Sequence, residues 1–439
     1  MNSPALLSIP FFLLLILIAT APIFFEAKWR KIYKHISFLF GAGMILFYFI
    51  VEKNPHPVAD TFSEYFSFIS LLAALYVVSG GIFIEVKVKA KPLVNVLFLI
   101  IGALLANVIG TTGASVLLIK PFIRMNNGRL KPYLIVFFIF LVSNIGGSLT
   151  PVGPPLFLGF LQGVPFSWNL THGIFPWLVS VGLLSVIFLF LDSGNKKALM
   201  TKGALNIVVG GGNAEEGTAN TNNGGGNIKI TGTKNFLWLL LILFSVFLEP
   251  SKINWLPSVG GYSYVREIFQ LLIAFVCFKT TNKKILSQNN FLFEPILEVA
   301  FLFFGIFFTM IPALEMMNDF SKSISLNSTI LYWGCGISSS FLDNAPAYLA
   351  FLTSSMSSLG LHPEEILKMT TQFSKELLAI STGAVFFGGM TYIGNGPNFM
   401  VKTMAEEMKL DMPEFFTYII KYAIPYLLPV LIIVWLIFF

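Results

Sequence analysis

The sequence predicts an all-α polytopic membrane protein with inverted repeats, each containing a re-entrant helical hairpin and a broken transmembrane helix. Three observations predict this class: the composition, the lengths of the apolar runs and the distribution of basic residues. Of the 439 residues, 55% are hydrophobic and only 11% are charged, whereas soluble domains carry about 25% charged residues. The chain therefore needs lipid as its solvent, and many of its apolar runs approach the roughly 20 residues that cross a hydrocarbon core.

Apolar runs follow one another along the whole chain. They lie at 5–25, 36–51, 66–86, 93–123, 132–165, 173–192, 235–249, 263–278, 291–317, 329–358, 366–401 and 414–439. Run 93–123 is interrupted at Gly110–Gly113, and run 329–358 is interrupted between Ser338 and Pro346. Both are too long for one crossing and too broken for two, so we expect hairpins that enter and leave on one side.

Basic residues test this topology, because cytoplasmic loops carry an excess of Lys and Arg. Positive residues follow the first apolar run and do not precede it, which indicates an uncleaved first helix with its N-terminus outside. With both broken runs treated as hairpins, the outside loops hold only Lys53, Lys252 and Lys322. We therefore expect a multi-pass protein of the inner (cytoplasmic) membrane with both termini outside, and hairpins that enter from opposite faces.

Each predicted hairpin is followed by a long apolar run that Gly and Pro interrupt. Run 132–165 is broken around Asn144–Pro155, and run 366–401 is broken around Gly388–Pro397. A hairpin plus a broken helix thus occurs twice in opposite orientation, an arrangement typical of secondary transporters. The predicted organisation is scaffold helices in 1–92, a first repeat in 93–192, a loop in 193–234, linking and scaffold helices in 235–290, and a second repeat in 291–439.

Segment 193–234 is rich in Gly and Asn, and we expect it to be a cytoplasmic linker. Alternating apolar residues at Leu205–Val209 and Ile228–Ile230 predict a short β-hairpin inside it. Its glycine runs lack the strand and helix that would frame a phosphate-binding loop.

Polar residues occupy the four predicted breaks. Non-helical backbone at membrane depth is tolerated only where it is buried or lines a cavity, so we expect the breaks to converge. Hydroxyl, amide and carbonyl oxygens suit sodium, whereas half-helix N-termini favour an anion. The candidate ion- or substrate-binding residues are Thr111, Thr112, Ser115, Asn144, Ser148, Thr150, Asp343, Asn344, Thr391, Asn395 and Asn398.

Asp343 lies at the predicted tip of the second hairpin. A carboxylate at membrane depth is costly unless it binds a cation or a proton, so Asp343 is a candidate to bind sodium and a proton alternately. The alternative is a structural carboxylate that caps the following half-helix. Both roles are compatible.

Other charged residues lie inside predicted helices. Glu298 and Glu376 are candidates for a proton relay, although an ion pair with Lys375 explains Glu376 equally well. Lys120 is expected to extend its side chain to the cytoplasmic surface. The acids near helix ends, for which we expect no special role, are Glu64, Glu85, Glu267, Glu294 and Glu315.

The chain shows no pattern of an enzyme or of a nucleic-acid-binding protein. No paired catalytic groups, nucleophile or metal cluster is evident, and no cofactor is expected. No metal is expected other than transported sodium. The Lys and Arg residues are scattered through short loops, which does not predict a nucleic-acid surface.

Four motifs in order carry a family resemblance across most of residues 90–439. They are Val108–Ser115 with Ile119–Pro121, Asn144–Pro151, Asp343–Pro346 and Thr391–Asn398. In these motifs the chain resembles the NhaD-type sodium/proton antiporters and the citrate-transporter group of the ion transporter superfamily. The resemblance implies a scaffold and a transport domain, often in a homodimer, that work by alternating access. It also implies a substrate site where the hairpin tips meet the broken helices.

One departure from the family pattern concerns the first broken helix. Relatives carry an acidic residue between the glycine and the prolines, whereas here Gly153 is followed directly by Pro154 and Pro155. This departure gives Asp343 more weight and leaves the ion stoichiometry open.

Two functions from different classes remain open. One is exchange of sodium, or lithium, for protons, and the other is sodium-coupled uptake of a small organic anion such as citrate. The predicted core contains no Arg or Lys, with Lys375 the nearest candidate, and Asp343 would repel an anion. These two features favour the antiporter. A channel or a metalloid efflux pump is supported by shared fold alone.

Overall fold

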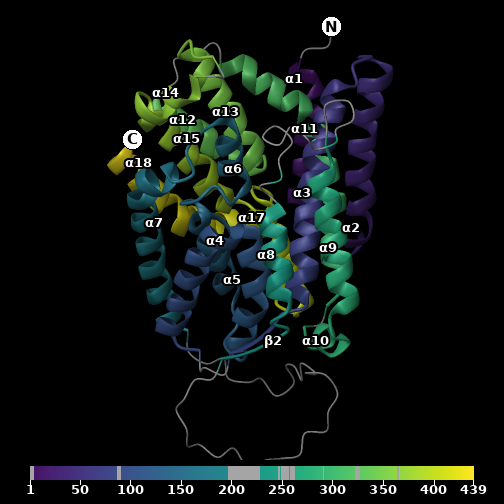
Figure 1. Cartoon of the computed structure of the whole chain (residues 1–439), viewed down its shortest axis with the longest axis vertical. Coiled ribbons are helices and arrows are strands. Elements are labelled where there is room, and N and C mark those ends of the chain that lie inside the picture. Colours follow the sequence, from purple (N-terminus) through teal and green to yellow (C-terminus); the bar gives the residue numbers. More distant parts are fainter. Residues whose placement is uncertain are drawn as a thin grey trace, which may run out of the picture.

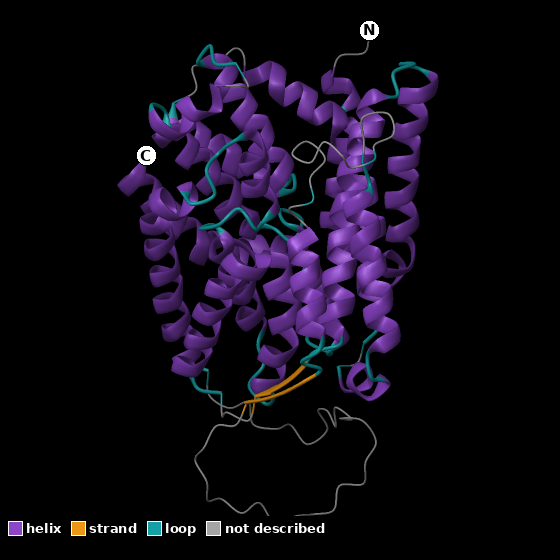
Figure 2. Ribbon diagram, in the orientation of Figure 1, coloured by secondary structure: helices purple, strands orange, loops and turns teal. Residues whose placement is uncertain are grey.

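The computed structural model describes residues 4–86, 90–195, 228–245, 263–289, 291–321, 327–362 and 365–439, together with Leu248 and Pro257. Helices dominate this part of the chain (Figure 2). Within it, six helices are long and apolar enough to cross a membrane. This confirms the predicted class, an all-α polytopic membrane protein.

One group of helices stands together on the right side of Figure 1. It contains α1 (Pro4–Leu7), α2 (Ile9–Ile50), α3 (His56–Gly80), α8 (Asn235–Ser245), α9 (Val265–Thr280), α10 (Lys283–Gln288) and α11 (Glu294–Ser321). The helix α11 packs along α2 and α3, and α9 packs against α3 and α8. Small residues allow the close approach of α2 and α11, since a Cβ at Gly305 would lie 2.5 Å from the Ser37 carbonyl oxygen. The two runs predicted at 5–25 and 36–51 are joined in α2.

The first hairpin is formed by α4 (Pro92–Met125), in which Gly110 alone departs from helical geometry with a φ of 74°. The side chains of Asn95 and Asn126 exchange hydrogen bonds of 2.8 and 2.9 Å, and the rings of Phe98 and Phe122 lie 5.2 Å apart. The two ends of α4 therefore meet. The chain reverses at Gly110, where glycine tolerates a positive φ that a side chain would disfavour.

The second hairpin consists of α12 (Ser328–Ser339) and α13 (Asn344–Ser358), which pack against each other. A Cβ at Gly334 in α12 would lie 2.9 Å from the Phe351 ring in α13. Figure 1 places α12 and α13 at the upper end of the molecule and α4 below them. The two hairpins thus approach the centre from opposite ends, as the inverted-repeat prediction requires.

Both long apolar runs after the hairpins are broken at a pair of glycines. The first comprises α5 (Pro132–Phe138), the π-helical η1 (Ile139–Asn144), the 3-10 turn η2 (Ile145–Gly147) and α6 (Pro154–Gln162). The second comprises α14 (Ile366–Thr371), α15 (Ser374–Phe386), the 3-10 turn η4 (Phe387–Met390) and α16 (Gly396–Glu407). Short π and 3-10 segments of this kind often mark functional positions in helices.

The last helices of each repeat enclose the broken segments. They are α7 (Trp168–Ser193) and the C-terminal α17 (Phe415–Tyr418), η5 (Ile419–Leu427) and α18 (Leu428–Phe438). The broken segments are deeply buried, and Val136, Phe138 and Leu141 of the first one are fully buried. The domain boundaries that the sequence predicts remain a prediction.

A two-stranded sheet contains one of the two segments that were predicted to form a β-hairpin in the loop. The strand β2 (Ile228–Thr231) pairs in antiparallel register with β1 (Phe83–Val86), which directly follows α3. Residues 205–209, the predicted partner, lie outside the described part of the chain. The side chain of Asn235 donates to the Gly81 carbonyl at 2.8 Å, and this bond fixes the start of α8 beside the end of α3.

Basic residues predicted to be cytoplasmic, Arg124 among them, lie beside β1 and α10 at the end that carries the sheet, the lower end in Figure 1. The Arg124 guanidinium lies over the Phe83 ring at 4.6 Å and donates to the Gln288 carbonyl at 2.9 Å. Nearby, Arg129 pairs with Asp192 at 2.9 Å. This placement agrees with the charge pattern, while the orientation in a membrane remains a prediction.

Candidate functional site

The two broken helices meet at an asparagine cluster formed by Asn144, Asn395 and Asn398. The Asn144 side-chain amide donates to the Asn398 side-chain oxygen at 2.8 Å, although the two residues are 254 positions apart. In return, the Asn395 amide donates to the Asn144 oxygen at 3.0 Å and to the Ser143 carbonyl at 2.8 Å. The sequence predicted that these side chains converge, and all three are buried.

The tip of the first hairpin packs against the first break. The hydroxyls of Ser115 and Ser143 share a hydrogen bond of 2.7 Å, and Thr150 donates to the Asn107 carbonyl at 2.6 Å. A Cβ at Gly147 would lie 2.4 Å from the Thr111 methyl group. Ser148 is buried in the same break. The predicted polar residues of the first repeat are therefore close neighbours of one another.

The tip of the second hairpin packs against the second break in the same way. Thr391 donates to the Ser340 carbonyl, and Ser339 donates to the Ala384 carbonyl. The Asn344 amide, with its nitrogen turned toward them, reaches the Ala384 and Gly394 carbonyls.

Gly388 lies between a side chain of the first repeat, Asn144, and one of the second, Asn344. A Cβ there would lie 2.4 Å from the nearer atom of the Asn344 amide group and 2.6 Å from the Asn144 oxygen, so only glycine fits between them.

Three carbonyl oxygens converge beside Gly394. A Cβ at this position would lie 2.8 Å from the Gly388 and Ser339 oxygens and 2.9 Å from the Ser340 oxygen. Two of these carbonyls belong to the hairpin tip and one to the second break. Two of these oxygens already accept hydrogen bonds, the Ser340 carbonyl from the Thr391 hydroxyl and the Gly388 carbonyl from the Asn398 amide. Carbonyl oxygens are ligands of the kind that hard cations prefer.

Asp343 caps a helix, as the sequence predicted, and also lies on the wall of a cavity. It is the N-cap of α13, and its carboxylate accepts from the Asn344 backbone N–H at 2.9 Å. It also lines a cavity, while only 4% of its surface is exposed. A capping role and a ligand-binding role are thus geometrically compatible.

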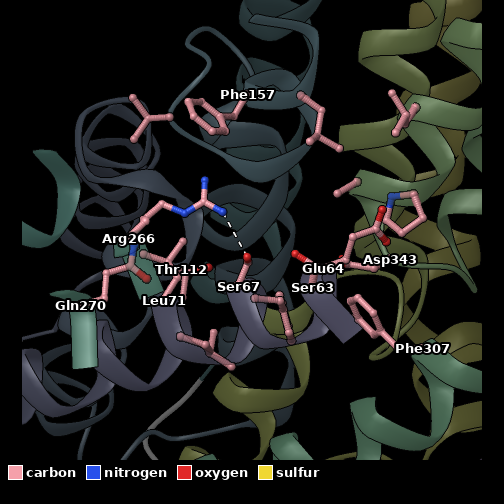
Figure 3. A pocket seen from close by; sticks show the side chains of 17 residues that line it. Ser63, Glu64, Ser67, Leu71, Thr112, Phe157, Arg266, Gln270, Phe307 and Asp343 are labelled. Carbon is pink, nitrogen blue, oxygen red and sulfur yellow. Dashed lines mark hydrogen bonds between the residues drawn. The ribbon is translucent and has the colours of Figure 1, made fainter. Parts of the chain in front are cut away.

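The cavity lies between the scaffold helices and the repeats and has a volume of about 260 Å³, close to the lower end of the roughly 300–1,000 Å³ of small-ligand pockets. Thr112 of the first hairpin and Asp343 of the second both line it. Figure 3 shows Arg266 of α9 facing Asp343 from the opposite wall, with Ser67 and Glu64 of α3 between them.

Arg266 corrects the expectation that the core contains no basic side chain. Its guanidinium donates to the Ser67 hydroxyl at 3.0 Å and contacts the Glu267 carboxylate at 2.7 Å. In the sequence, Arg266 stands near the start of an apolar run and looks like a residue of a helix end. One signal was available, because an ionisable residue within an apolar run is often functional. The sequence does not show, however, that the first turn of α9 packs beside the hairpin tips. Glu64 and Glu267, for which no role was expected, lie at or beside this cavity.

Lys120 also differs from its prediction. Its side chain is buried, with 7% exposed, and its ammonium group donates to the Asn289 carbonyl at 2.9 Å. Asn289 in turn donates to the Gly80 and Ile82 carbonyls at the end of α3. A carbonyl inside the protein therefore accepts a hydrogen bond from this lysine, and the side chain does not extend to the surface.

The two relay candidates lie apart from the cavity. Glu298 pairs with Lys34 at 3.3 Å and lines a different cavity, which it shares with Glu294 and Glu406. Glu376 lies in the first turn of α15, because α14 ends at Thr371 and the helix is interrupted there. The sequence suggested that Glu376 lies deep in a continuous helix, and this prediction is wrong. Among the described residues, no group of three His, Cys, Asp or Glu could hold a metal ion.

Two hairpin tips that meet two broken helices around a small cavity, inside a bundle of apolar helices, define the class of secondary transporters. The chain belongs to the family described as "Putative citrate transport", whose model matches residues 1–439. A comparison with curated proteins found no match.

Proposed function

We propose that this protein couples the movement of a small carboxylate anion, with citrate as the first candidate, to the movement of a cation. One observation carries the proposal: Arg266 and Asp343 line a single cavity at the hairpin tips. A guanidinium is suited to carboxylates because its planar fork can make two parallel hydrogen bonds. The family description supports citrate as the first anion to test.

The coupled cation is proposed to be sodium, bound at the second repeat. Asp343 and Glu64 both line the cavity, so an anion would meet repulsion there unless a cation accompanied it. The carbonyls of Ser339, Ser340 and Gly388 beside Gly394 supply neutral oxygen ligands. A buried carboxylate near such ligands is a common place for an ion pathway in membrane proteins.

Alternating access is part of the proposal, since the cavity lies between scaffold helices and the repeats. The hairpins and broken helices would move against α3, α9 and α11 and expose the cavity first to one side and then to the other. By the resemblance described above, we also propose a homodimer in the cytoplasmic membrane with both termini outside.

Sodium/proton antiport is the second candidate, and the charge balance of the cavity favours it. Two carboxylates, Asp343 and Glu64, line the cavity together with one guanidinium, and that guanidinium already contacts Glu267. The excess of negative charge suits cations alone.

Purified protein in liposomes separates the two functions. Uptake of labelled citrate, driven by an inward sodium gradient, supports the carboxylate transporter. Proton movement that sodium alone drives, reported by an internal pH dye with no citrate uptake, supports the antiporter. A rate of citrate uptake that does not depend on the sodium gradient would contradict the proposed sodium coupling.

A further inference from the structure

Glu267 holds Arg266 with only one of its two carboxylate oxygens. The oxygen Oε1 accepts from Arg266 Nε at 2.8 Å and from the Ser67 hydroxyl at 2.6 Å, and it lies 2.7 Å from Arg266 Nη2. The other oxygen, Oε2, is buried and has no hydrogen-bond partner among the described residues. Only 1% of Glu267 is exposed. A buried carboxylate oxygen without a donor is unusual, because most buried polar atoms are hydrogen-bonded.

A second acceptor of the same kind lies one turn further along α9. Gln270 lines the cavity and is 1% exposed. Its amide nitrogen donates to the Ser245 hydroxyl of α8 at 3.0 Å, which leaves its oxygen Oε1 buried and without a donor in the described part of the chain. Residues three apart are neighbours on a helix surface. Two acceptors without donors therefore lie on one face of α9, and a proton between them would convert one acceptor into a donor.

Arg266 has two possible anionic partners, the Glu267 carboxylate and a substrate carboxylate in the cavity. Its guanidinium points into the cavity (Figure 3), while two of its nitrogens are engaged by Glu267. A substrate carboxylate in the cavity would seek the same guanidinium, since both are oxyanions and the fork is most favourable when it is paired with one of them. Glu267 and the substrate thus compete for Arg266.

We propose that Arg266 is the subsite for a substrate carboxylate and that Glu267 is a proton-binding group that controls it. A proton from the aqueous phase binds Glu267 at Oε2, which then donates to Gln270. The neutral side chain holds the guanidinium less strongly, so Arg266 pairs with the substrate. No other bond forms or breaks. Coupling of this kind is reciprocal, so bound substrate also favours the protonated Glu267.

This inference rests on the proposed carboxylate transport and adds a proton to the sodium ion as a coupled species. The other titratable groups that line the cavity with Arg266 are Glu64 on α3 and Asp343 at the start of α13. The described residues of α8 include no charged side chain, and Ser245 is the α8 residue that bonds to Gln270. Because Arg266 belongs to α9 and Asp343 to a repeat, the anion and the sodium ion are held by different parts of the fold.

Glu267→Gln is the informative variant. Its oxygen can still accept from Arg266 and Ser67, and its amide nitrogen can donate to Gln270 in place of the proton. The variant therefore imitates protonated Glu267 and satisfies the two acceptors, so it is expected to fold. The matched control is Glu365→Gln, because Glu365 also pairs with a basic residue, Lys368, at an exposed position away from the cavity.

The test measures the KM for labelled citrate in liposomes at several pH values, from mildly acidic to mildly alkaline. Each variant is compared with the wild type at the same pH, which cancels the ionisation of citrate itself. The wild-type KM is expected to rise about tenfold toward alkaline pH, a typical coupling between two sites. Glu267→Gln should keep the low KM throughout, so its ratio to the wild type falls as pH rises. Glu365→Gln should follow the wild type.

Two further variants make the result independent of one substitution. Arg266→Gln should raise the KM at every pH, and Arg266→Lys should recover part of the loss because it keeps the charge without the fork. Ser67→Ala removes a hydrogen-bond donor that stabilises ionised Glu267. Glu267 should then keep its proton to higher pH, so the rise in KM should also move to higher pH. A constant ratio of Glu267→Gln to the wild type, or an unchanged KM in Arg266→Gln, would overturn the inference. Failure of the wild type to transport any carboxylate would instead overturn the proposed function.

Discussion

The two hairpin tips have the same architecture and different chemistry. The first reverses at Gly110 and presents the neutral side chains of Thr111, Thr112 and Ser115. The second reverses ahead of Asp343, which carries the carboxylate, and its Ser339 and Ser340 carbonyls converge beside Gly394. The first break lacks an acidic residue between Gly153 and Pro154. Among the residues of the tips and breaks, the negative charge therefore lies in the second repeat, while the first repeat presents neutral oxygens.

The largest expected effect comes from removing this charge. Asp343→Asn keeps the cap of α13, since Asn caps a helix about as well as Asp, but it removes the charge that a cation needs. We expect sodium-driven transport in liposomes to fall to background, while the purified protein elutes as the wild type does. Thr112→Ala in the first hairpin is the matched variant and should retain measurable transport. Equal loss in both would show that the two tips are not chemically different.

Gly394→Ala tests the carbonyl cluster. The added Cβ would lie within 2.9 Å of three carbonyl oxygens, so the Ser339, Ser340 or Gly388 backbone must shift. We expect the sodium concentration for half-maximal transport to rise about 10- to 100-fold, as when supporting groups of a metal site are disturbed. The control is Gly182→Ala on α7, where a Cβ would meet no atom within 4 Å. An unchanged sodium dependence in Gly394→Ala would show that sodium does not bind at this location.

Asn144→Ala tests the junction between the repeats. It leaves the Asn398 oxygen without the amide that donates to it and breaks the contact with Asn395. Each buried polar group left unpaired costs about 1–3 kcal/mol, so the melting temperature in detergent should fall clearly. Ser115→Ala breaks a single bond inside the first repeat, and its effect should be smaller. If the order of these two shifts were reversed, the asparagine cluster would not be the main junction.

The smallest effect is expected from the loop. Replacing residues 198–226 with a short Gly/Ser linker leaves β2, its pairing with β1, and the start of α8 in place. Citrate uptake per molecule should therefore equal that of the wild type. Loss of uptake in a variant that still inserts normally would mean that this segment takes part in transport.

Local signals in the sequence predicted the parts of the site that lie in interrupted apolar runs. Glycine, proline and polar residues interrupting apolar runs located the hairpins and breaks, and the bias of basic residues placed the hairpins at opposite ends. The asparagine cluster followed, because breaks at membrane depth must satisfy one another. Arg266 could not be found in this way, since its role depends on how α9 packs beside α3 and the hairpin tips. Pairing of β2 with β1 and burial of Lys120 were missed for the same reason, because each depends on partners far away in the chain.

Linkage between sodium and citrate tests the central claim most directly. The affinity of purified protein for citrate is measured by calorimetry at several sodium concentrations, with ionic strength held constant by choline, for the wild type and Asp343→Asn. We predict that sodium raises the affinity of the wild type about tenfold or more, a typical coupling between two sites, and leaves Asp343→Asn unchanged. Citrate binding that is equally sensitive to sodium in both proteins, or insensitive in the wild type, would contradict a cation site at Asp343.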